Sequence, residues 1–229
     1  MFGDIGMFNG IEIGAIELII YFIFCNFLTK IQFPLQQINA ISYYWIMVTI
    51  LTGLWEAGFI FNNYDTCELS QKYLNNSEHV WFNTYDITYV VPWKLSKIFY
   101  AEYGAYADRE YMTLKDDWSR IIESTHAFFC GLFSLLAVYN KIKNNERNYL
   151  ILINVAMGSQ LMNSLLYMAK YFNTLTEVNS VNYVTDKFPA GVALTKRPFM
   201  YVNIFWTLMP VYVILVELKK KTNNYNINE

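Results

Sequence analysis

Residues 41–61 read ISYYWIMVTILTGLWEAGFIF, an apolar run broken by one carboxylate, Glu56. About 20 apolar residues in helical form span the hydrocarbon core of a bilayer, so this stretch predicts a transmembrane helix. Four further stretches have the same character, at 11–28, 118–139, 149–171 and 199–218. The sequence therefore predicts an all-α fold, a polytopic membrane bundle of five transmembrane helices.

The composition supports a membrane protein and excludes several other classes. The chain is 55% hydrophobic and 16% charged, whereas soluble domains carry roughly 25% charged residues. A net charge of −2 gives no basic face for a nucleic acid. Two histidines, His79 and His126, and three separated cysteines form no metal-ligand pattern, and no glycine-rich loop marks a nucleotide site. We expect neither a metal nor a cofactor.

The charged residues between the spans predict an orientation. Basic residues fall at three places, which five spans put on one side: Lys30, Lys141, Lys143, Arg147, Lys219, Lys220 and Lys221. By the positive-inside rule this is the cytoplasmic or matrix side. The acidic connection at 62–117 falls on the opposite side and is too long for a passive linker. We expect it to be a loop that caps the bundle, within one domain covering residues 1–229.

Two glutamates inside the spans are the first candidates for a functional site. Glu56 has Thr52 one helical turn before it, and Glu123 has His126 nearly one turn after it. A carboxylate within a membrane is expensive and is by default a functional-site hypothesis. Residues three or four apart share a helix face, so these groups are expected to face one polar cavity between helices. The alternative is that they only hold the helices together.

Three other charged side chains receive structural interpretations. Glu12 and Glu17 lie near the start of the first span, where acids complement the helix dipole or reach water. Lys170 closes the fourth span, and its long side chain is expected to extend to the membrane surface.

Four short motifs occur in order along the spans. Helix two carries Trp-Glu-Ala-Gly-Phe at 55–59, and helix four carries Gln-Leu-Met-Asn-Ser-Leu-Leu-Tyr at 160–167. Around helix three, Ala-Glu-Tyr at 101–103 leads to Asp116, seven residues before Glu123, and Gly-Leu-Phe-Ser follows at 131–134. Helix five carries Asn203, Trp206 and Pro210 with the spacing Asn-x-x-Trp-x-x-x-Pro. Together these motifs resemble the emopamil-binding protein family, the sterol Δ8–Δ7 isomerases of the EXPERA group.

This resemblance implies an acid–base site in an EXPERA-like bundle. In that chemistry a proton is added at sterol C9, a cation develops at C8 and a proton leaves C7. Burial favours the protonated carboxyl that such a reaction needs, and tryptophan is the best aromatic partner for a cation. The implied catalytic residues are Glu56, Glu123 and His126, and the implied substrate-binding residues are Thr52, Asn203 and Trp206.

The departures from the family pattern keep other interpretations open. Thr52 stands where the family has a catalytic His, and Ser164 stands where it has an Asp. Leu132 replaces the Pro after the helix-three Gly. His126 stands where the family has a Thr, so His and Thr have exchanged helices. If the two positions face each other, the cavity keeps its imidazole; otherwise the acid–base set has decayed and His126 is a structural residue.

Three functions therefore follow from the sequence. The first is an intramolecular isomerase acting on a sterol-like lipid, and the second is a module that binds or transports such a lipid. The third is a catalytically degenerate accessory subunit of a larger membrane complex, such as a mitochondrial respiratory assembly. The resemblance implies the endoplasmic reticulum, with the mitochondrial inner membrane as the alternative. We also expect protein partners to hold both termini.

Overall fold

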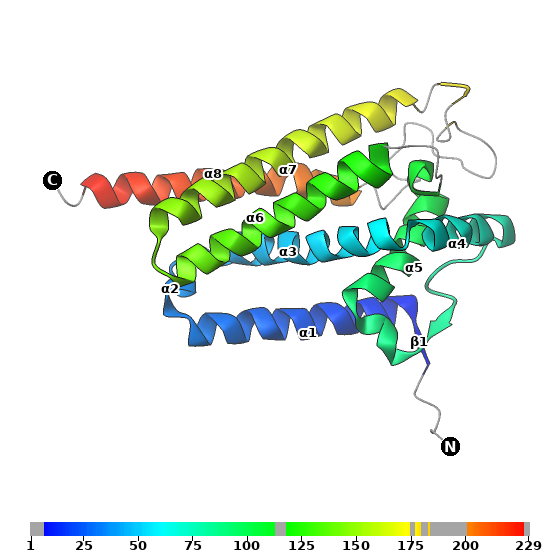
Figure 1. Cartoon of the computed structure of the whole chain (residues 1–229), viewed down its shortest axis with the longest axis horizontal. Helices are drawn as coiled ribbons and strands as arrows, with labels where there is room; N and C mark the ends of the chain where they lie inside the picture. Colours follow the sequence, from blue (N-terminus) through cyan, green and yellow to red (C-terminus); the bar gives the residue numbers. More distant parts are fainter. Residues whose placement is uncertain (1–6, 113–117, 175–176, 180–182, 184–200, 227–229) are drawn as a thin grey trace, which may run out of the picture.

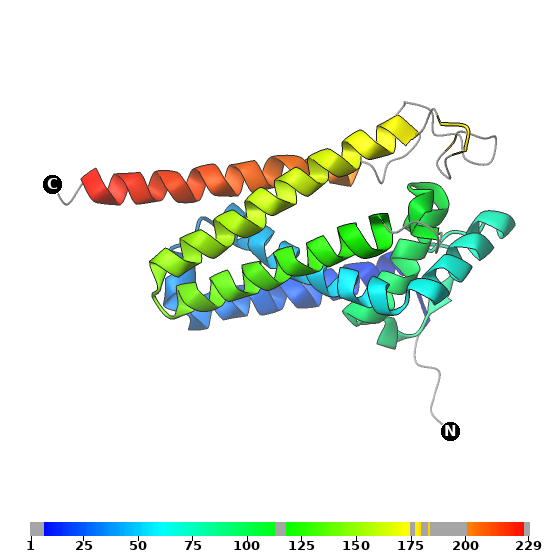
Figure 2. The same ribbon diagram turned by 45° about the horizontal axis from the view of Figure 1, so that its top comes forward.

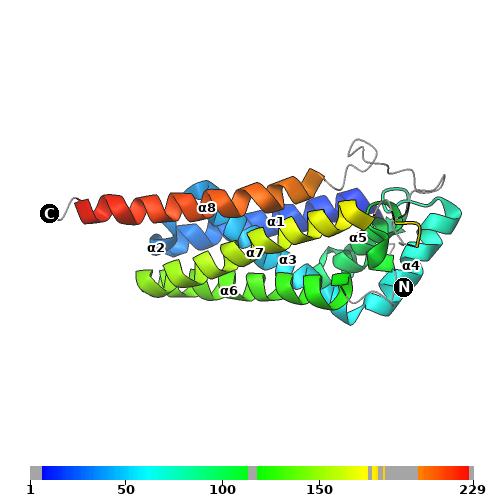
Figure 3. The same cartoon turned by 90° about the horizontal axis from the view of Figure 1, so that it is seen from above.

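The structure, a computed structural model, describes residues 7–112, 118–174, 177–179, 183 and 201–226. Five long helices run side by side along the long axis (Figures 1 and 3), and each is long and apolar enough to cross a membrane. They are α1 (Gly10–Ile31), α3 (Ala40–Phe61), α6 (Ser124–Ile142), α7 (Glu146–Thr174) and α8 (Tyr201–Asn226). The predicted all-α polytopic bundle of five apolar helices is confirmed.

The outer faces of these helices are apolar. Ile19 and Ile23 on α1 are 59% and 65% exposed, and Leu208 and Leu215 on α8 are 60% and 62% exposed. Apolar surface on this scale is unusual for a protein in water, whereas lipid tails cover it at no cost. The fold is that of an integral membrane protein.

Asparagine side chains fix the starts of two of the spans. Asn9 and Glu12 form a reciprocal capping box at the start of α1, with N···O distances of 2.8 and 3.0 Å. Asn39 accepts the Ile41 N–H at 3.0 Å at the start of α3. Both caps bind amide groups that lack partners within the helix. The short helix α2 (Phe33–Gln36) turns the chain between these two spans.

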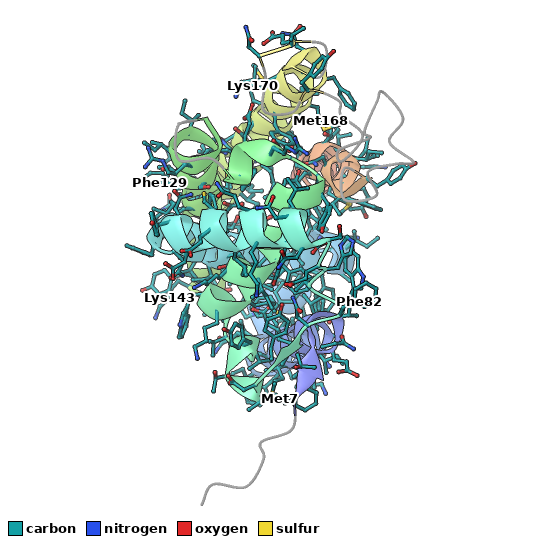
Figure 4. All side chains as sticks on the ribbon, turned by 90° about the vertical axis from the view of Figure 1, so that its right-hand side faces the viewer. Met7, Phe82, Phe129, Lys143, Met168 and Lys170 are labelled. Carbon is teal, nitrogen blue, oxygen red and sulfur yellow. The ribbon has the colours of Figure 1, made fainter. Side chains whose placement is uncertain are left out.

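The connection predicted to be a loop is instead largely helical. It contains α4 (Asn63–Asn76), the strand β2 (Thr84–Tyr85), η1 (Ile87–Val90), α5 (Pro92–Tyr106) and η2 (Arg109–Met112). Strand β2 pairs with β1 (Phe8–Asn9), and α4 lies across the end of the bundle (Figure 4). We call this region, residues 63–112, the cap. Its helices are too short and too polar to read as spans, which is why the sequence suggested a loop.

The side chains of α5 explain why it is a helix. Pro92 occupies its first turn, where the missing N–H costs nothing. Leu95, Ile98, Ala101 and Ala105 are buried and recur at helical spacing. They form a core with Ile13 of α1 and the rest of the cap. A second core lies at the opposite end of the bundle, between α1, α3, α6 and α7, whose course Figure 2 shows. The middle of α3 lies between these two cores.

One buried carboxylate joins the cap to the start of α1. Both oxygens of Glu102, on α5, are engaged: Oε1 is 2.7 Å from His79 Nδ1, and Oε2 accepts the Val80 N–H at 2.9 Å. The Val80 carbonyl in turn accepts the Gly10 N–H at 3.2 Å. The His79 ring is stacked against Tyr106, 4.1 Å between centroids. Burial raises the pKa of Glu102 despite these hydrogen bonds.

Replacing Glu102 with alanine is expected to lower the free energy of unfolding by about 1–3 kcal/mol, because the buried Val80 N–H loses its acceptor. Thermal unfolding in lipid nanodiscs would measure the loss. The control is Glu78→Ala, since the Glu78 carboxylate forms only an ion pair with Lys72 and an exposed hydrogen bond with Asn76 and should contribute about 0–1 kcal/mol. Equal losses from the two variants would contradict this role of Glu102.

The two ends of the bundle carry the groups that the orientation prediction separates. At one end Lys220 of α8 donates to the Gln37 carbonyl at 2.7 Å, and the α6–α7 turn lies nearby (Figure 1). The cap occupies the other end. The assignment of these ends to membrane sides stays a prediction. Asp116 lies outside the described residues. So do the outermost residues of both termini, which protein partners were expected to hold.

Candidate functional site

A cavity of about 260 Å³ lies between the spans and the cap, close to the lower end of the roughly 300–1,000 Å³ typical of ligand sites. Its walls come from α3, α5, α6, α7 and α8 and are largely apolar. All six residues singled out from the sequence line it: Thr52, Glu56, Glu123, His126, Asn203 and Trp206. The structure thus brings them together, and their roles stay predictions.

Two glycines explain how the candidate groups on α3 and α6 come close. A Cβ on Gly53 would lie 3.0 Å from the Gly131 Cα, and a Cβ on Gly131 would lie 2.9 Å from the Gly53 Cα. Small residues at such a crossing let two helix backbones approach closely within a membrane. Thr52 and Glu56 flank this crossing on α3, and His126 precedes it on α6.

Glu56 enters the cavity from α3 and is almost fully buried. Its Oε1 accepts a hydrogen bond from the hydroxyl of Tyr100 on α5. The carboxyl also interacts with the Ser124 side chain at the start of α6, while its Oε2 is buried and forms no close hydrogen bond among the described residues. A buried polar atom without a partner costs free energy, so this oxygen is available to a bound ligand.

Glu123 faces the same cavity from the start of α6. It is the last residue of a π-helical turn, η3 (Trp118–Glu123), a geometry frequent at functional sites. Its Oε2 also lacks a hydrogen bond among the described residues, and its carboxyl interacts electrostatically with that of Glu56. Two carboxylates in one apolar cavity repel each other. A shared proton or a cation between them relieves that repulsion.

His126 and Thr52 are both held by hydrogen bonds. His126 Nε2 is 2.8 Å from Ser159 Oγ on α7, and the Cys130 Sγ is 3.8 Å from the ring nitrogens. The Thr52 hydroxyl donates to the Val48 carbonyl at 2.9 Å, so its proton is used within α3. Thr52 therefore presents only acceptor lone pairs to the cavity, whereas the imidazole can exchange a proton.

The far wall of the cavity is positioned by α7 and α8. The Trp206 ring meets Trp45 edge to face, 4.8 Å between centroids, and Trp45 Nε1 donates to Gln160 Oε1 at 3.1 Å. Ser164 donates to the Trp206 carbonyl at 3.0 Å. Asn203 Nδ2 is 3.4 Å from the Tyr103 hydroxyl. These contacts hold the Trp206 indole and the Asn203 amide in the cavity wall.

The sequence did not reveal the contribution of the cap. Tyr100 and Tyr103 on α5 and Tyr111 on η2 line the cavity, and Tyr111 packs against both of the others. Burial raises the pKa of all three well above the ordinary value, so these hydroxyls stay neutral at physiological pH. The only signal was the Glu-Tyr pair at 102–103. The chain has 19 tyrosines, and composition alone does not separate wall residues from core residues.

Glu17 and Lys170, which were expected to have structural roles, have other neighbours than the sequence suggested. Glu17 is buried, 5% exposed, and accepts the indole N–H of Trp55 at 3.1 and 3.2 Å, so it supports the cavity wall rather than reaching water. Lys170 does not only extend outward but forms an ion pair with Glu110 of the cap at 2.8 Å. Both side chains tie a span to the cavity region.

The proposed exchange of His and Thr between helices predicts energetic coupling. Thr52→His and His126→Thr are each expected to destabilise the protein or weaken ligand binding. The double variant should recover about 0.5–3 kcal/mol, because the two side chains line the same cavity from adjoining helices. Thermal unfolding and binding of a cationic amphiphile, measured on all four proteins, would give the coupling energy. Strictly additive losses would show that the two positions are independent.

No family model matches the chain, and no similar protein is found among the curated proteins or the solved structures. The resemblance of its motifs to the sterol isomerases therefore stands on the quoted residues alone. The geometry of the cavity is the other indication of function.

Proposed function

We propose that this membrane protein binds a sterol-like lipid in the cavity and moves a double bond within it by proton transfer. The observation that carries the proposal is the meeting of two carboxyls, Glu56 and Glu123, with the His126 imidazole in one largely apolar cavity. The emopamil-binding protein family, which the motifs resemble, performs this reaction. The cavity chemistry supports the same reaction class in this chain.

The groups around the cavity suit each step of such an isomerisation. A protonated carboxyl of the glutamate pair donates to sterol C9, and the C8=C9 electron pair forms the new C–H bond. The cation left at C8 is stabilised by the ionised carboxyl and by the Trp206 ring. A base then takes the C7 proton, and that C–H electron pair becomes the C7=C8 double bond. Glu56, Glu123 and His126 are the candidate bases.

The size of the cavity defines how the lipid would lie. About 260 Å³ encloses only part of a ring system as large as a sterol. Val202 lines the cavity and is 51% exposed, so it marks a side on which the cavity meets the membrane. The reacting rings would lie beside the carboxyls, and the remainder of the lipid would extend past Val202 into the bilayer.

Conversion of a Δ8-sterol tests the proposal directly. Membranes carrying the chain, from a host without its own isomerase, are expected to form the Δ7 product, which gas chromatography with mass spectrometry identifies. Membranes from the same host with an empty vector are the control. If the folded chain is present at a normal level and only the Δ8-sterol is recovered, the isomerase proposal is wrong.

One specific observation favours an accessory subunit as the second candidate. Thr52 and Ser164 stand at two acid–base positions of the family, and both hydroxyls instead donate to backbone carbonyls. Such bonds stabilise helices and their contacts without contributing a titrating group. This candidate predicts that the chain, isolated under mild detergent from its native membrane, is recovered with a fixed set of other chains and has no isomerase activity.

A further inference from the structure

A continuous chain of hydrogen bonds leads from the cavity into the cap. The hydroxyls of Tyr103 on α5 and Tyr167 on α7 are 2.6 Å apart. Tyr167 donates to Asp108 Oδ2, just after α5, at 2.8 Å. Both distances are those of good O–H···O hydrogen bonds. Three groups able to exchange protons are thus linked across α5, α7 and the residues just after α5.

The two ends of this chain lie in different surroundings. Tyr103 lines the cavity together with Glu123. Asp108 is buried, 1% exposed, and its Oδ1 accepts the Glu110 N–H at 2.9 Å. Glu110 pairs with Lys170, which lies at the edge of the molecule in Figure 4 with 29% of its side chain exposed. The hydrogen-bonded chain therefore runs from the cavity to Asp108, and the neighbouring Glu110 is paired with a partly exposed lysine at the cap end.

Electrostatics connects the same groups. Asp108 interacts with Tyr103 and Tyr167, and Glu123 interacts with Asp108 and Glu110. Among the described residues, Arg109, Glu110 and Lys170 are further charged groups close to Asp108. A neutral hydroxyl both accepts and donates a proton, and Tyr103 stays neutral because burial, followed by the Asp108 charge, raises its pKa. The hydrogen-bonded row of Tyr103, Tyr167 and Asp108 is therefore suited to pass protons in either direction.

We infer that Tyr103, Tyr167 and Asp108 form a proton relay between the cavity and the aqueous side of the cap. Inward, Asp108 gives its proton to Tyr167, Tyr167 gives its own to Tyr103, and Tyr103 gives its own to the cavity. Each tyrosine oxygen gains one proton as it loses one, while an ionised carboxyl in the cavity gains a proton and Asp108, protonated at the start, becomes the carboxylate that accepts from Tyr167. A proton from the aqueous side then restores the Asp108 acid. The inference deepens the proposed function, on which it rests, because an acid enclosed among apolar walls needs a route to regain its proton.

The relay has a purely structural alternative, in which the same bonds only tie α7 to the cap. The rate at which a cavity carboxyl exchanges its proton for deuterium separates the two, since a tie has no effect on that rate. Infrared spectroscopy of the full chain in lipid bilayers follows the C=O stretch of protonated Glu123 after transfer to D₂O. The band is assigned by its loss in Glu123→Gln, at a pH at which it is present in the unmodified protein.

Tyr167→Phe and Asp108→Asn are each expected to slow this exchange by about 10²-fold, the lower end of what a positioned proton donor contributes. Asn keeps the shape of Asp and an acceptor for Tyr167, so the fold is retained if Tyr167→Phe proves unstable. The matched control is Tyr106→Phe, which removes a hydroxyl that donates to the Tyr73 and Glu78 carbonyls of the cap, outside the relay. The control should exchange at the unmodified rate.

Exchange that is equally fast in Tyr167→Phe, Asp108→Asn and the unmodified protein would overturn the relay. Exchange slowed equally by Tyr106→Phe would also overturn it, because a general loosening or tightening of the cap would then be the cause. The measurement needs no turnover. Exchange that is slowed in the relay variants, without sterol conversion, therefore leaves the relay standing and removes the isomerase. Sterol conversion, with exchange that the relay variants do not change, removes the relay and leaves the isomerase standing.

Discussion

Replacing Glu56 or Glu123 with glutamine is expected to reduce the conversion of a Δ8-sterol by about 10²- to 10⁴-fold, the usual contribution of a positioned acid or base. Glutamine keeps the shape of the side chain and its hydrogen-bonding capacity but neither donates a proton as an acid nor carries the charge that stabilises a cation. The initial rate of Δ7-sterol formation, divided by the amount of folded protein in the membrane, measures the effect.

Glu12→Gln is the matched control for these two variants. Glu12 is an exposed acid at the start of α1 whose Oε2 accepts the Asn9 N–H, a bond that a glutamine also accepts. Its conversion rate should equal that of the unmodified chain. Full activity in Glu56→Gln and in Glu123→Gln would remove the glutamate pair from the mechanism. Activity lost only in His126→Ala would move the acid–base role to the imidazole.

A cationic amphiphile with an apolar ring body is expected to bind the purified chain, and Glu123→Gln should weaken that binding by about 2–5 kcal/mol, the cost of removing one partner of a buried charge pair. The ammonium group stands in for the carbocation and would lie between Glu56, Glu123 and the Trp206 ring. Each 1.4 kcal/mol is about tenfold in Kd, so the expected loss is roughly 30-fold or more. Calorimetry or displacement of a labelled ligand measures it.

The aromatic contribution is smaller and has its own control. Trp206→Leu should weaken amphiphile binding by about 0.5–2 kcal/mol, the range of a cation–π contact. Trp93→Leu removes an indole that is 58% exposed and outside the cavity, and it should leave the Kd unchanged. A neutral analogue of the amphiphile should bind the unmodified chain and Glu123→Gln equally. If it instead shows the same loss as the cation, charge is not what Glu123 contributes.

Binding and conversion together separate the three functions. Conversion lost in the glutamate variants supports the isomerase. Amphiphile binding that depends on Glu123, without conversion by the unmodified chain, supports a module that binds or carries a lipid. Absence of both, with other chains recovered in fixed amounts, supports the accessory subunit.

The sequence by itself determined the five spans, because the length of an apolar run is a local property and the bilayer fixes the length required. It also determined the capping box at the start of α1, since Asn9 and Glu12 lie three residues apart and need no distant partner. Glu56 and Glu123 were recognised for the same reason: a carboxyl in an apolar run is costly wherever the helix packs.

Only the tertiary structure decided what surrounds those carboxyls. The segment expected to be a loop folds into α4 and α5 because its apolar residues find Ile13 and the rest of the cap core, a contact between distant parts of the chain. That packing brings Tyr100 and Tyr103 against the cavity and aligns Tyr103 with Tyr167. It likewise turned Glu17 towards the Trp55 indole. Propensity and periodicity describe which face a residue occupies along its own helix, whereas the partner of that face depends on how distant helices pack, which no local pattern specifies.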